Sequence, residues 1–247
     1  MFRRIIRNSR QAFSTVAFPE YASFLSSTFK LRAELMEEAV GMLIPESMTA
    51  PELNKGFFYF QRPHKETGLP KFCRVPADVS GRVIDVDAHN ELEEEILCLT
   101  EIAENSFVSV SVAKICLENK FLGFVSDNIG DERWKLRFRN LLTKTYLPTE
   151  IPLVRNFEWI DNTLCEGKFF YFSTMDPKTL RTNKILRGEL FEGQVRNEEL
   201  IWESPNSAEY LDIVKSKDGA CIFFSSSSKS QSEVRVVSAT DPHGVPE

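Results

Sequence analysis

The sequence predicts a mainly β protein, in which a partial β-propeller of about four blades is preceded by an N-terminal α-helix. Three observations lead to this fold class. Helical periodicity ends near residue 44 and is replaced by short β-rich runs between Pro, Gly, Asn and Asp. A pair of strands recurs at a constant interval. In each pair a nearly all-apolar strand is followed by one in which apolar residues alternate with Arg or Lys.

The N-terminal stretch, residues 1–17, has the composition of an organellar transit peptide. It carries four arginines, its apolar residues fall at helical spacing, and no acidic residue occurs before Glu20. The arginines are Arg3, Arg4, Arg7 and Arg10. We therefore exclude residues 1–17 from the fold and expect a mitochondrial location, with a plastid or cytoplasmic location as alternatives. A frayed basic tail is the simpler interpretation of the same residues.

Residues 20–44 are predicted to be helical, within an N-terminal segment that we place at 18–50. Apolar residues recur on one side of this stretch while its glutamates fall elsewhere, and Pro45 ends the pattern. The apolar stripe consists of Leu25, Phe29, Met36, Val40 and Leu43. The remainder, 51–247, is assigned to the partial propeller.

Three copies of the strand pair define the repeat. The apolar strands lie at 121–125, 168–172 and 220–224, and their partners begin at Trp134, Asn183 and Ser232, at intervals of 49 residues. A further strand precedes each pair, at 107–117, 157–164 and 209–216. A fainter copy occupies 56–62 and 69–75 and is followed by an acidic insertion around Glu91–Glu95.

The strand pattern has a physical explanation in a propeller. Inner and middle strands of a blade lie between neighbouring blades and are apolar on both faces, whereas outer strands meet solvent and alternate. The alternative is a β-sandwich in which the spacing is fortuitous. Because about four blades do not close a ring, we expect uncovered blade faces and a free strand edge, which favour aggregation or a protein partner.

Several stretches resemble the prolyl oligopeptidase family of serine peptidases, most closely its oligopeptidase B branch. Residues 33–62 resemble the lead-in helix and first blade strand of that family, and EEILCLTEIAEN (94–105) resembles its Glu-Glu-x-Leu-Leu-Asp-x-Asn-x-Leu-Ala segment. FLGFVSDNIGDERWKLRFRNL (121–141) and residues 157–194 resemble two of its blades, and SEVRVVSA resembles a later strand. The chain departs from the family at Cys116–Asn119, where Ser-Pro-Asp-Gly is usual.

The resemblance implies a seven-bladed propeller that caps an α/β-hydrolase domain and admits only short peptides. It implies cleavage by a serine nucleophile, after basic residues in oligopeptidase B. We expect the catalytic domain to be absent from this chain, which would then be inactive alone and would meet short peptides only through that domain. The alternative function is a catalytically inactive β-repeat module that binds another protein.

No residue of the sequence is assigned to catalysis. None of the glycines has Ser two places on, so the G-x-S-x-G turn of such hydrolases is missing. Ser225–Ser228 is interpreted as a loop or blade edge, and Asp131 and Glu132 with Arg133 and Arg137 as a solvated turn.

Cofactor and metal sites are likewise predicted to be absent. Gly81 and Gly123 belong to no phosphate-binding fingerprint. The five cysteines form no C-x-x-C pair and are expected to be buried reduced thiols, while the histidines are scattered. The cysteines are Cys73, Cys98, Cys116, Cys165 and Cys221, and the histidines are His64, His89 and His243.

Two classes of partner are also excluded by the sequence. No apolar stretch is long enough to span a membrane, and the formal net charge of −6 argues against nucleic acid or anionic membrane as the main partner.

Overall fold

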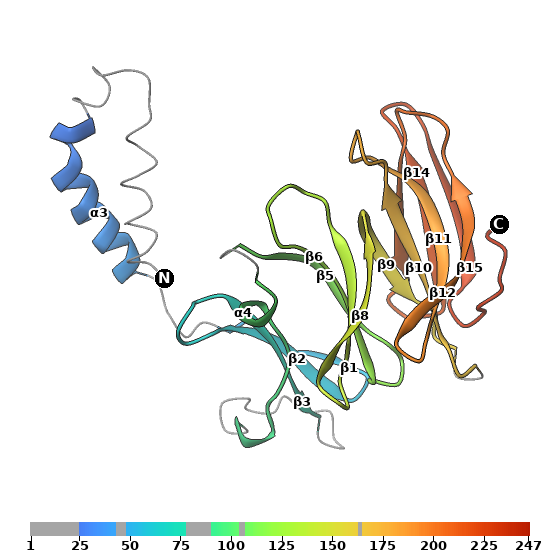
Figure 1. The fold of residues 1–247 in the computed structure, drawn as a ribbon, viewed down its shortest axis with the longest axis horizontal. Helices are drawn as coiled ribbons and strands as arrows, with labels where there is room; N and C mark the ends of the chain where they lie inside the picture. Colours follow the sequence, from blue (N-terminus) through green and yellow to red (C-terminus); the bar gives the residue numbers. More distant parts are fainter. Residues whose placement is uncertain (1–24, 43–47, 78–89, 104–106, 163–164) are drawn as a thin grey trace. The chain divides into compact units, whose positions relative to one another are not determined.

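The computed structural model describes residues 25–42, 48–77, 90–103, 107–162 and 165–247. The chain divides into two units, residues 1–100 and 101–247, each of which is described by itself. In the described residues the strands form four antiparallel sheets, one in the first unit and three in the second (Figure 1). The predicted transit peptide lies outside the described residues.

The first unit contains a helix, α3 (Phe29–Gly41), and one four-stranded sheet. The helix confirms the helical prediction where it is described, although its predicted apolar stripe is not buried: Phe29 and Met36 are 52% and 50% exposed. The predicted stop at Pro45 lies outside the described residues. The sheet consists, in order, of β1 (Glu52–Asn54), β2 (Phe57–Pro63), β3 (Pro70–Pro76) and β4 (Glu94–Cys98), with a 3-10 turn, η2 (Asn90–Leu92), before β4.

The second unit contains three sheets in which each strand pairs with its neighbour in the sequence. The sheets follow the short helix α4 (Leu99–Ile102), which spans the boundary between the units. The first sheet has β5 (Ser109–Ile115), β6 (Phe121–Asp127), β7 (Lys135–Asn140) and β8 (Thr145–Pro152). The second has β9 (Val154–Trp159), β10 (Lys168–Met175), β11 (Thr182–Phe191) and β12 (Gln194–Glu203). The third has β13 (Tyr210–Lys215), β14 (Cys221–Ser227) and β15 (Ser232–Ser238).

The predicted repeat is confirmed by this topology. The apolar segments that begin at 121, 168 and 220 are the second strands β6, β10 and β14 of three separate sheets. The alternating segments are the third strands β7, β11 and β15. One continuous sheet would have placed these strands side by side and would have excluded blades.

Alternate residues of one strand enter two different cores. Phe170 and Phe172 of β10 pack with Phe138 and Trp159 against the first sheet of the second unit. Tyr171, which lies between them, packs with Phe224 on the opposite side against the last sheet. Because successive side chains of a strand point to opposite faces, a strand between two sheets must be apolar throughout. This explains the nearly all-apolar runs in the sequence.

Two sheets approach each other closely at Gly123 of β6. A Cβ atom built on Gly123 would lie 2.6 Å from Cζ of Phe157 and 3.3 Å from Cζ2 of Trp159, both on β9. Any side chain at position 123 would therefore displace these rings. The need for glycine here comes from the packing between sheets, since Gly123 is not among the residues with positive φ.

Four strands, β1, β4, β8 and β12, were not expected from the sequence. The segment interpreted as an acidic insertion contains β4, in which Glu94 and Glu95 stand opposite Arg74 and Cys73 of β3. The outer strands β8 and β12 are also absent from the prediction, because exposed polar residues interrupt their alternation. These strands are held by backbone pairing and by cross-strand ion pairs, such as that between Arg74 Nε and Glu94 Oε2 at 2.8 Å.

Candidate functional site

The serines considered as a nucleophile belong to the edge of the last sheet. Ser225–Ser227 end β14, where the Ser226 hydroxyl donates to Glu209 Oε2 at 3.0 Å. The Ser228 hydroxyl donates to the carbonyl of Gln231 at 3.2 Å. These partners are a carboxylate and a backbone oxygen, neither of which forms the serine–histidine pair of a hydrolase.

Glu209 anchors the loop before the last sheet. Its carboxylate accepts hydrogen bonds from the hydroxyls of Ser204 and Ser226 and from the amides of Gln231 and Asn206. The Ser204 contact, followed by the other three, lowers the pKa of Glu209 to about 2. This carboxylate is therefore a stable anion that holds the loop and not a proton-transfer group near neutral pH.

The polar turn between β6 and β7 is organised by Asp127, which the sequence analysis did not single out. Its carboxylate accepts hydrogen bonds from the backbone N–H groups of Ile129, Gly130 and Glu132 at 2.9, 2.7 and 3.0 Å. Burial alone would raise the pKa of Asp127, but these amides lower it overall. Asp127 therefore serves to hold the backbone of this turn in place.

The charged residues predicted in this turn form one ion pair within the turn and one with a neighbouring strand. Arg133 Nε lies 3.8 Å from Asp131, whereas Arg137 pairs across the sheet with Glu150 of β8 at 3.1 Å. The sequence could not reveal this partner, because β8 was not recognised as a strand.

The histidines and cysteines are dispersed. His64 Nδ1 accepts from the backbone N–H of Glu66, and the His243 ring lies edge-on to Phe169, while His89 is outside the described residues. In the described part of the chain, no group of three His, Cys, Asp or Glu residues could hold a metal ion.

The cysteines are free thiols, as predicted, but their burial differs from the expectation. Cys73, Cys98 and Cys116 are buried. Cys165 and Cys221 are only partly buried; Cys221 lies on the side of the last sheet that no other sheet of the described residues covers.

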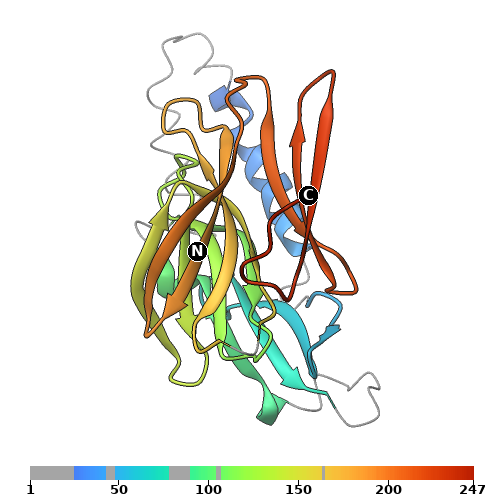
Figure 2. The same ribbon diagram turned by 90° about the vertical axis from the view of Figure 1, so that its right-hand side faces the viewer.

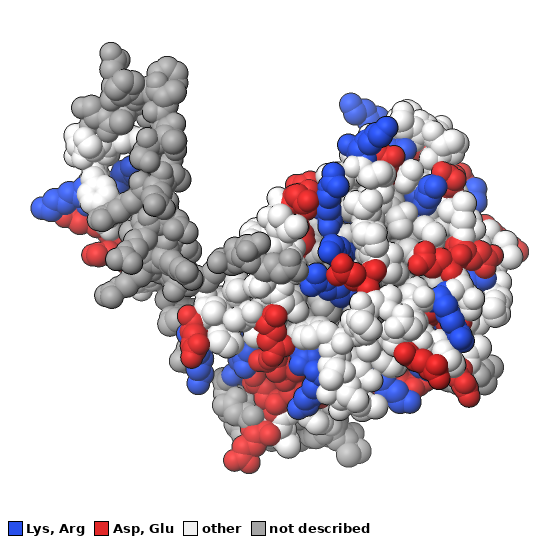
Figure 3. All heavy atoms as spheres, in the orientation of Figure 1, with Lys and Arg blue, Asp and Glu red and all other residues white. Residues whose placement is uncertain are grey.

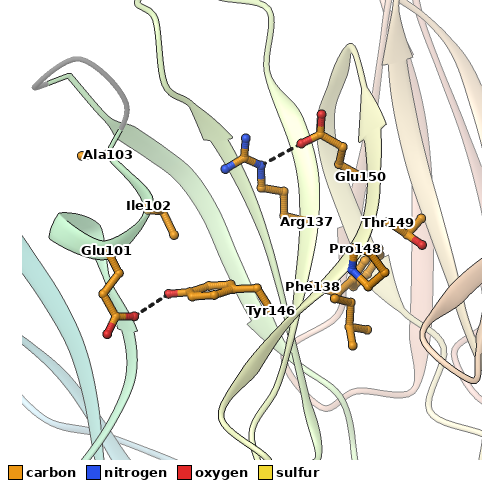
Figure 4. Close-up of a pocket in the computed structure, with 10 residues that line it drawn as sticks. Glu101, Ile102, Ala103, Arg137, Phe138, Tyr146, Pro148, Thr149 and Glu150 are labelled. Atoms are coloured by element: carbon orange, nitrogen blue, oxygen red, sulfur yellow. Dashed lines mark hydrogen bonds and ion pairs between the residues drawn. The ribbon is translucent and has the colours of Figure 1, made fainter.

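A cleft of about 330 Å³ lies between the end of α4 and strands β7 and β8 (Figure 4). At one end the Tyr146 hydroxyl donates to Glu101 Oε2 at 2.9 Å, and the Arg139 guanidinium lies 4.9 Å from the Tyr146 ring centre. At the other end Arg137 and Glu150 form the ion pair described above. Phe138, Leu147 and Pro148 also line the cleft.

The chemistry of this cleft is that of a contact surface. Its charged groups are already paired with one another, and its lining contains neither a histidine nor a cysteine. Such a mixture of an aromatic ring, a proline and paired charges can contact a polypeptide, but it contains neither a serine–histidine nor a cysteine–histidine pair.

A polar seam joins the first strands of the three sheets in the second unit. Lys114 Nζ of β5 lies 2.6 Å from Glu158 Oε1 of β9, and the same oxygen accepts from the backbone N–H of Lys215 on β13 at 3.0 Å. Asn156 Nδ2 donates to the carbonyl of Ile213 at 2.8 Å. These side chains tie each sheet to the next at the same edge, so the seam resists separation of the sheets.

One side of the last sheet is apolar and exposed. We call this surface, formed by Tyr210, Val214, Phe223, Val234 and Val236, the terminal face. Val214, Phe223 and Val236 stand opposite one another across the three strands and form a continuous apolar row. The predicted uncovered blade face is therefore present in the structure.

Charges do not gather by sign on the side of the molecule shown in Figure 3. Lys and Arg are interspersed with Asp and Glu over the second unit in this view. Among the described helices, none has both the length and the apolar character needed to cross a membrane.

Comparison with known proteins identifies similar chains. Residues 20–246 match the family model described as prolyl oligopeptidase, N-terminal beta-propeller domain. The chain is 29% identical over 213 residues to Protease 2 of Moraxella lacunata, and 22% identical over 219 residues to dipeptidyl aminopeptidase BI of Pseudoxanthomonas mexicana. These matches cover 85% and 86% of this chain but 30% of each relative.

Solved structures show the same fold. Oligopeptidase B from Leishmania major aligns with a TM-score of 0.76 at 21% identity, over 91% of this chain and 30% of that one. Oligopeptidase B from Trypanosoma brucei aligns with a TM-score of 0.71 at 21% identity, over 94% and 32%. The chain thus spans less than a third of the length of the curated relatives. Because the family model matches almost the entire sequence and the sheets follow one another as blades, the chain belongs to the prolyl oligopeptidase family and represents part of its N-terminal β-propeller domain.

Proposed function

We propose that this chain is the non-catalytic propeller portion of an oligopeptidase B-like serine peptidase, in which it caps the active site and restricts substrates to short peptides. The observation that carries the proposal is the match of residues 20–246 to the N-terminal propeller domain of the family. The family membership does not favour the alternative of an unrelated interaction module.

The polar seam supports a role as a size filter. A cap that excludes large substrates must keep its blades together, and Glu158 holds both Lys114 and the backbone of Lys215 at the junction of three sheets. The apolar cores on either side of β9 and β10 add to this cohesion. Exclusion would then depend on the rigidity and shape of the sheets and would require no individual recognition residue.

A chimera provides the test. The part of this chain that aligns with Moraxella lacunata Protease 2 over 213 residues would replace the matching part of that enzyme, and the purified chimera would be offered a short Arg-containing peptide and reduced casein. We expect cleavage of the peptide at no less than a tenth of the rate of the parent, with casein still excluded. Cleavage of both substrates at similar rates would refute the cap function.

A pair of variants of the chimera sharpens the test. Glu158→Ala should increase casein cleavage relative to peptide cleavage, because it breaks the seam. Glu203→Ala is the matched control, since Glu203 forms an exposed ion pair with Lys184 away from the seam. The isolated chain should release no product above background from the short peptide. Turnover by the isolated chain would contradict its assignment as non-catalytic.

We also propose that residues 1–17 direct the protein to mitochondria and are then removed. The four arginines and the lack of acidic residues before Glu20 support this proposal. N-terminal sequencing of the mature protein from fractionated cells should begin after residue 17. An intact Met1 on protein recovered from the cytosol would reject it.

A further inference from the structure

Two edge strands of the second unit, β9 and β13, have backbone groups that point away from their own sheets. Among the described residues β9 pairs with β10, and β13 pairs with β14 in the last sheet, whose strands are the orange to red ribbons of Figure 2. Alternate residues of such an edge strand direct their N–H and C=O groups away from the sheet. The N–H groups of Ile160 and Ser216 donate inward, to β10 and to the start of β14. Phe157 and Ile213, three residues earlier, are therefore outward residues.

The same side-chain contact covers the outward N–H in both strands. Asn156 Oδ1 accepts a hydrogen bond from the backbone N–H of Phe157 at 2.8 Å. Asp212 Oδ1 accepts one from the backbone N–H of Ile213, also at 2.8 Å. Asn156 Nδ2 in turn donates to Asp212 Oδ1 at 2.9 Å, so the two side chains form one unit between the sheets.

The outward carbonyls are covered as well. Lys114 Nζ donates to the carbonyl of Phe157 at 3.0 Å, and Asn156 Nδ2 donates to the carbonyl of Ile213 at 2.8 Å. The next outward N–H of β13, that of Lys215, donates to a carboxylate of β9 at 3.0 Å. Both backbone groups of Phe157 and both of Ile213 thus have partners within the chain.

We propose that Lys114, Asn156 and Asp212 form an edge seal, which keeps extended peptides from adding to β9 and β13 as a further strand. Strand addition derives its affinity from main-chain hydrogen bonds to an open edge. At this edge, each bond to an incoming peptide would replace a bond that the chain already makes, so the net gain is small.

The seal has a use in a cap that meets short peptides, because such peptides are then not held on the cap itself. This use rests on the proposed function. The seal rests on the contacts of the two strands and can be tested without peptidase activity.

The sealed edge lies within reach of solvent. Asp212 is exposed, Asn156 is half-buried, and the hydrogen bond between them is exposed. If the two side chains were removed, water could bond to the outward backbone groups, and so could a peptide in extended conformation.

The test uses the full chain and a fluorescein-labelled peptide, Lys-Thr-Val-Thr-Val-Thr-Val-Lys, whose residues favour strands. In fluorescence anisotropy, Asn156→Ala/Asp212→Ala should bind this peptide about tenfold more tightly than the wild type does. The same peptide with N-methyl groups at alternate residues lacks donors for strand pairing and should not show this gain. Asn140→Ala/Asp176→Ala is the matched control, because these side chains hold backbone N–H groups of turns. It should bind as the wild type does.

Amide hydrogen exchange reports on the seal directly. The N–H groups of Phe157 and Ile213 should exchange about tenfold faster in Asn156→Ala/Asp212→Ala than in the wild type, because they lose their acceptors. Asp212→Asn keeps an acceptor oxygen and should match the wild type in both exchange and peptide binding.

Circular dichroism and a single thermal transition establish that each variant is folded. Equal peptide affinity of the wild type and Asn156→Ala/Asp212→Ala would overturn the proposal, as would an equal gain for the N-methylated peptide. Faster exchange without tighter peptide binding would also overturn it. Tighter binding by the double variant, together with a failed chimera, would reject the cap function alone.

Discussion

Replacing Gly123 with alanine is expected to destabilise the packing between the first two sheets of the second unit. The added Cβ would lie 2.6 and 2.7 Å from two atoms of the Phe157 ring, well inside van der Waals contact. Phe157 is fully buried and its ring meets Trp159 edge-on at 5.8 Å, so it has little room to move. The strain must therefore be relieved by a shift of the two sheets.

The magnitude follows from two opposing effects. Overpacking of a dense core typically costs about 1–3 kcal/mol, whereas alanine in place of glycine within a strand gains about 0.5–1 kcal/mol from lower chain entropy. The net loss is about 1–2 kcal/mol, which lowers Tm by roughly 2–8 °C for a chain of this size. Differential scanning calorimetry and urea denaturation of the wild type and the variant would measure it.

A double-mutant cycle tests the cause. In a Phe157→Leu background the ring atoms that meet the new Cβ are gone, so Gly123→Ala should be neutral or stabilising there, with a coupling of about 1–2 kcal/mol. Gly41→Ala is a control for the entropy effect, because no described atom outside its chain neighbours and its own helix backbone lies within 4 Å of the added Cβ. A Gly123→Ala protein that melts at or above the wild type, or a cycle without coupling, would refute the close approach of the sheets.

Three further predictions concern single side chains. Glu158→Gln should lower the free energy of unfolding by about 1 kcal/mol in urea denaturation, because Lys114 loses a charged partner in the seam. If Glu203→Gln lowers the free energy of unfolding equally, the seam adds no more stability than an exposed ion pair. Hydrogen bonds lower the pKa of Glu209 to about 2 from 4.5, so the advantage of the wild type over Glu209→Gln in Tm should be complete above about pH 4.5 and disappear as the pH falls toward 2. A Tm difference that is constant from pH 2 to 7 would contradict this. Burial, with Glu93 beside it, raises the pKa of Cys73 to about 12. Iodoacetamide at pH 8 should therefore leave Cys73 unmodified in the native protein, as mass spectrometry can verify. Rapid labelling of Cys73 in the native protein would argue against its buried position.

The parts of the fold that the sequence predicted correctly are those with a strong hydrophobic signature. A strand such as β10, with Phe170 and Tyr171 entering different cores, must be apolar on both faces, and such runs are conspicuous in a sequence. Outer strands such as β8 carry a weaker signal, because most of their residues meet solvent. Their positions follow from pairing with an inner strand that is already in place.

The candidate surfaces were predicted unevenly. The existence of an uncovered blade face followed from counting repeats, but its residues did not, because Phe223 and Phe224 are identical in type and only the packing distinguishes the exposed ring from the buried one. The cleft between α4 and β8 was not foreseen at all. It brings Glu101 to Tyr146 across 45 positions of sequence, a contact that no local pattern encodes.

The sequence by itself determined the repeat and the family, because hydrophobic alternation and constant spacing are properties of neighbouring residues along one chain. Tertiary structure alone decided which face each strand buries, why position 123 is glycine, and how Glu158 joins three sheets. These features arise where strands far apart in sequence meet, and the energy of such contacts depends on distances of a few tenths of an ångström that the order of residues does not express.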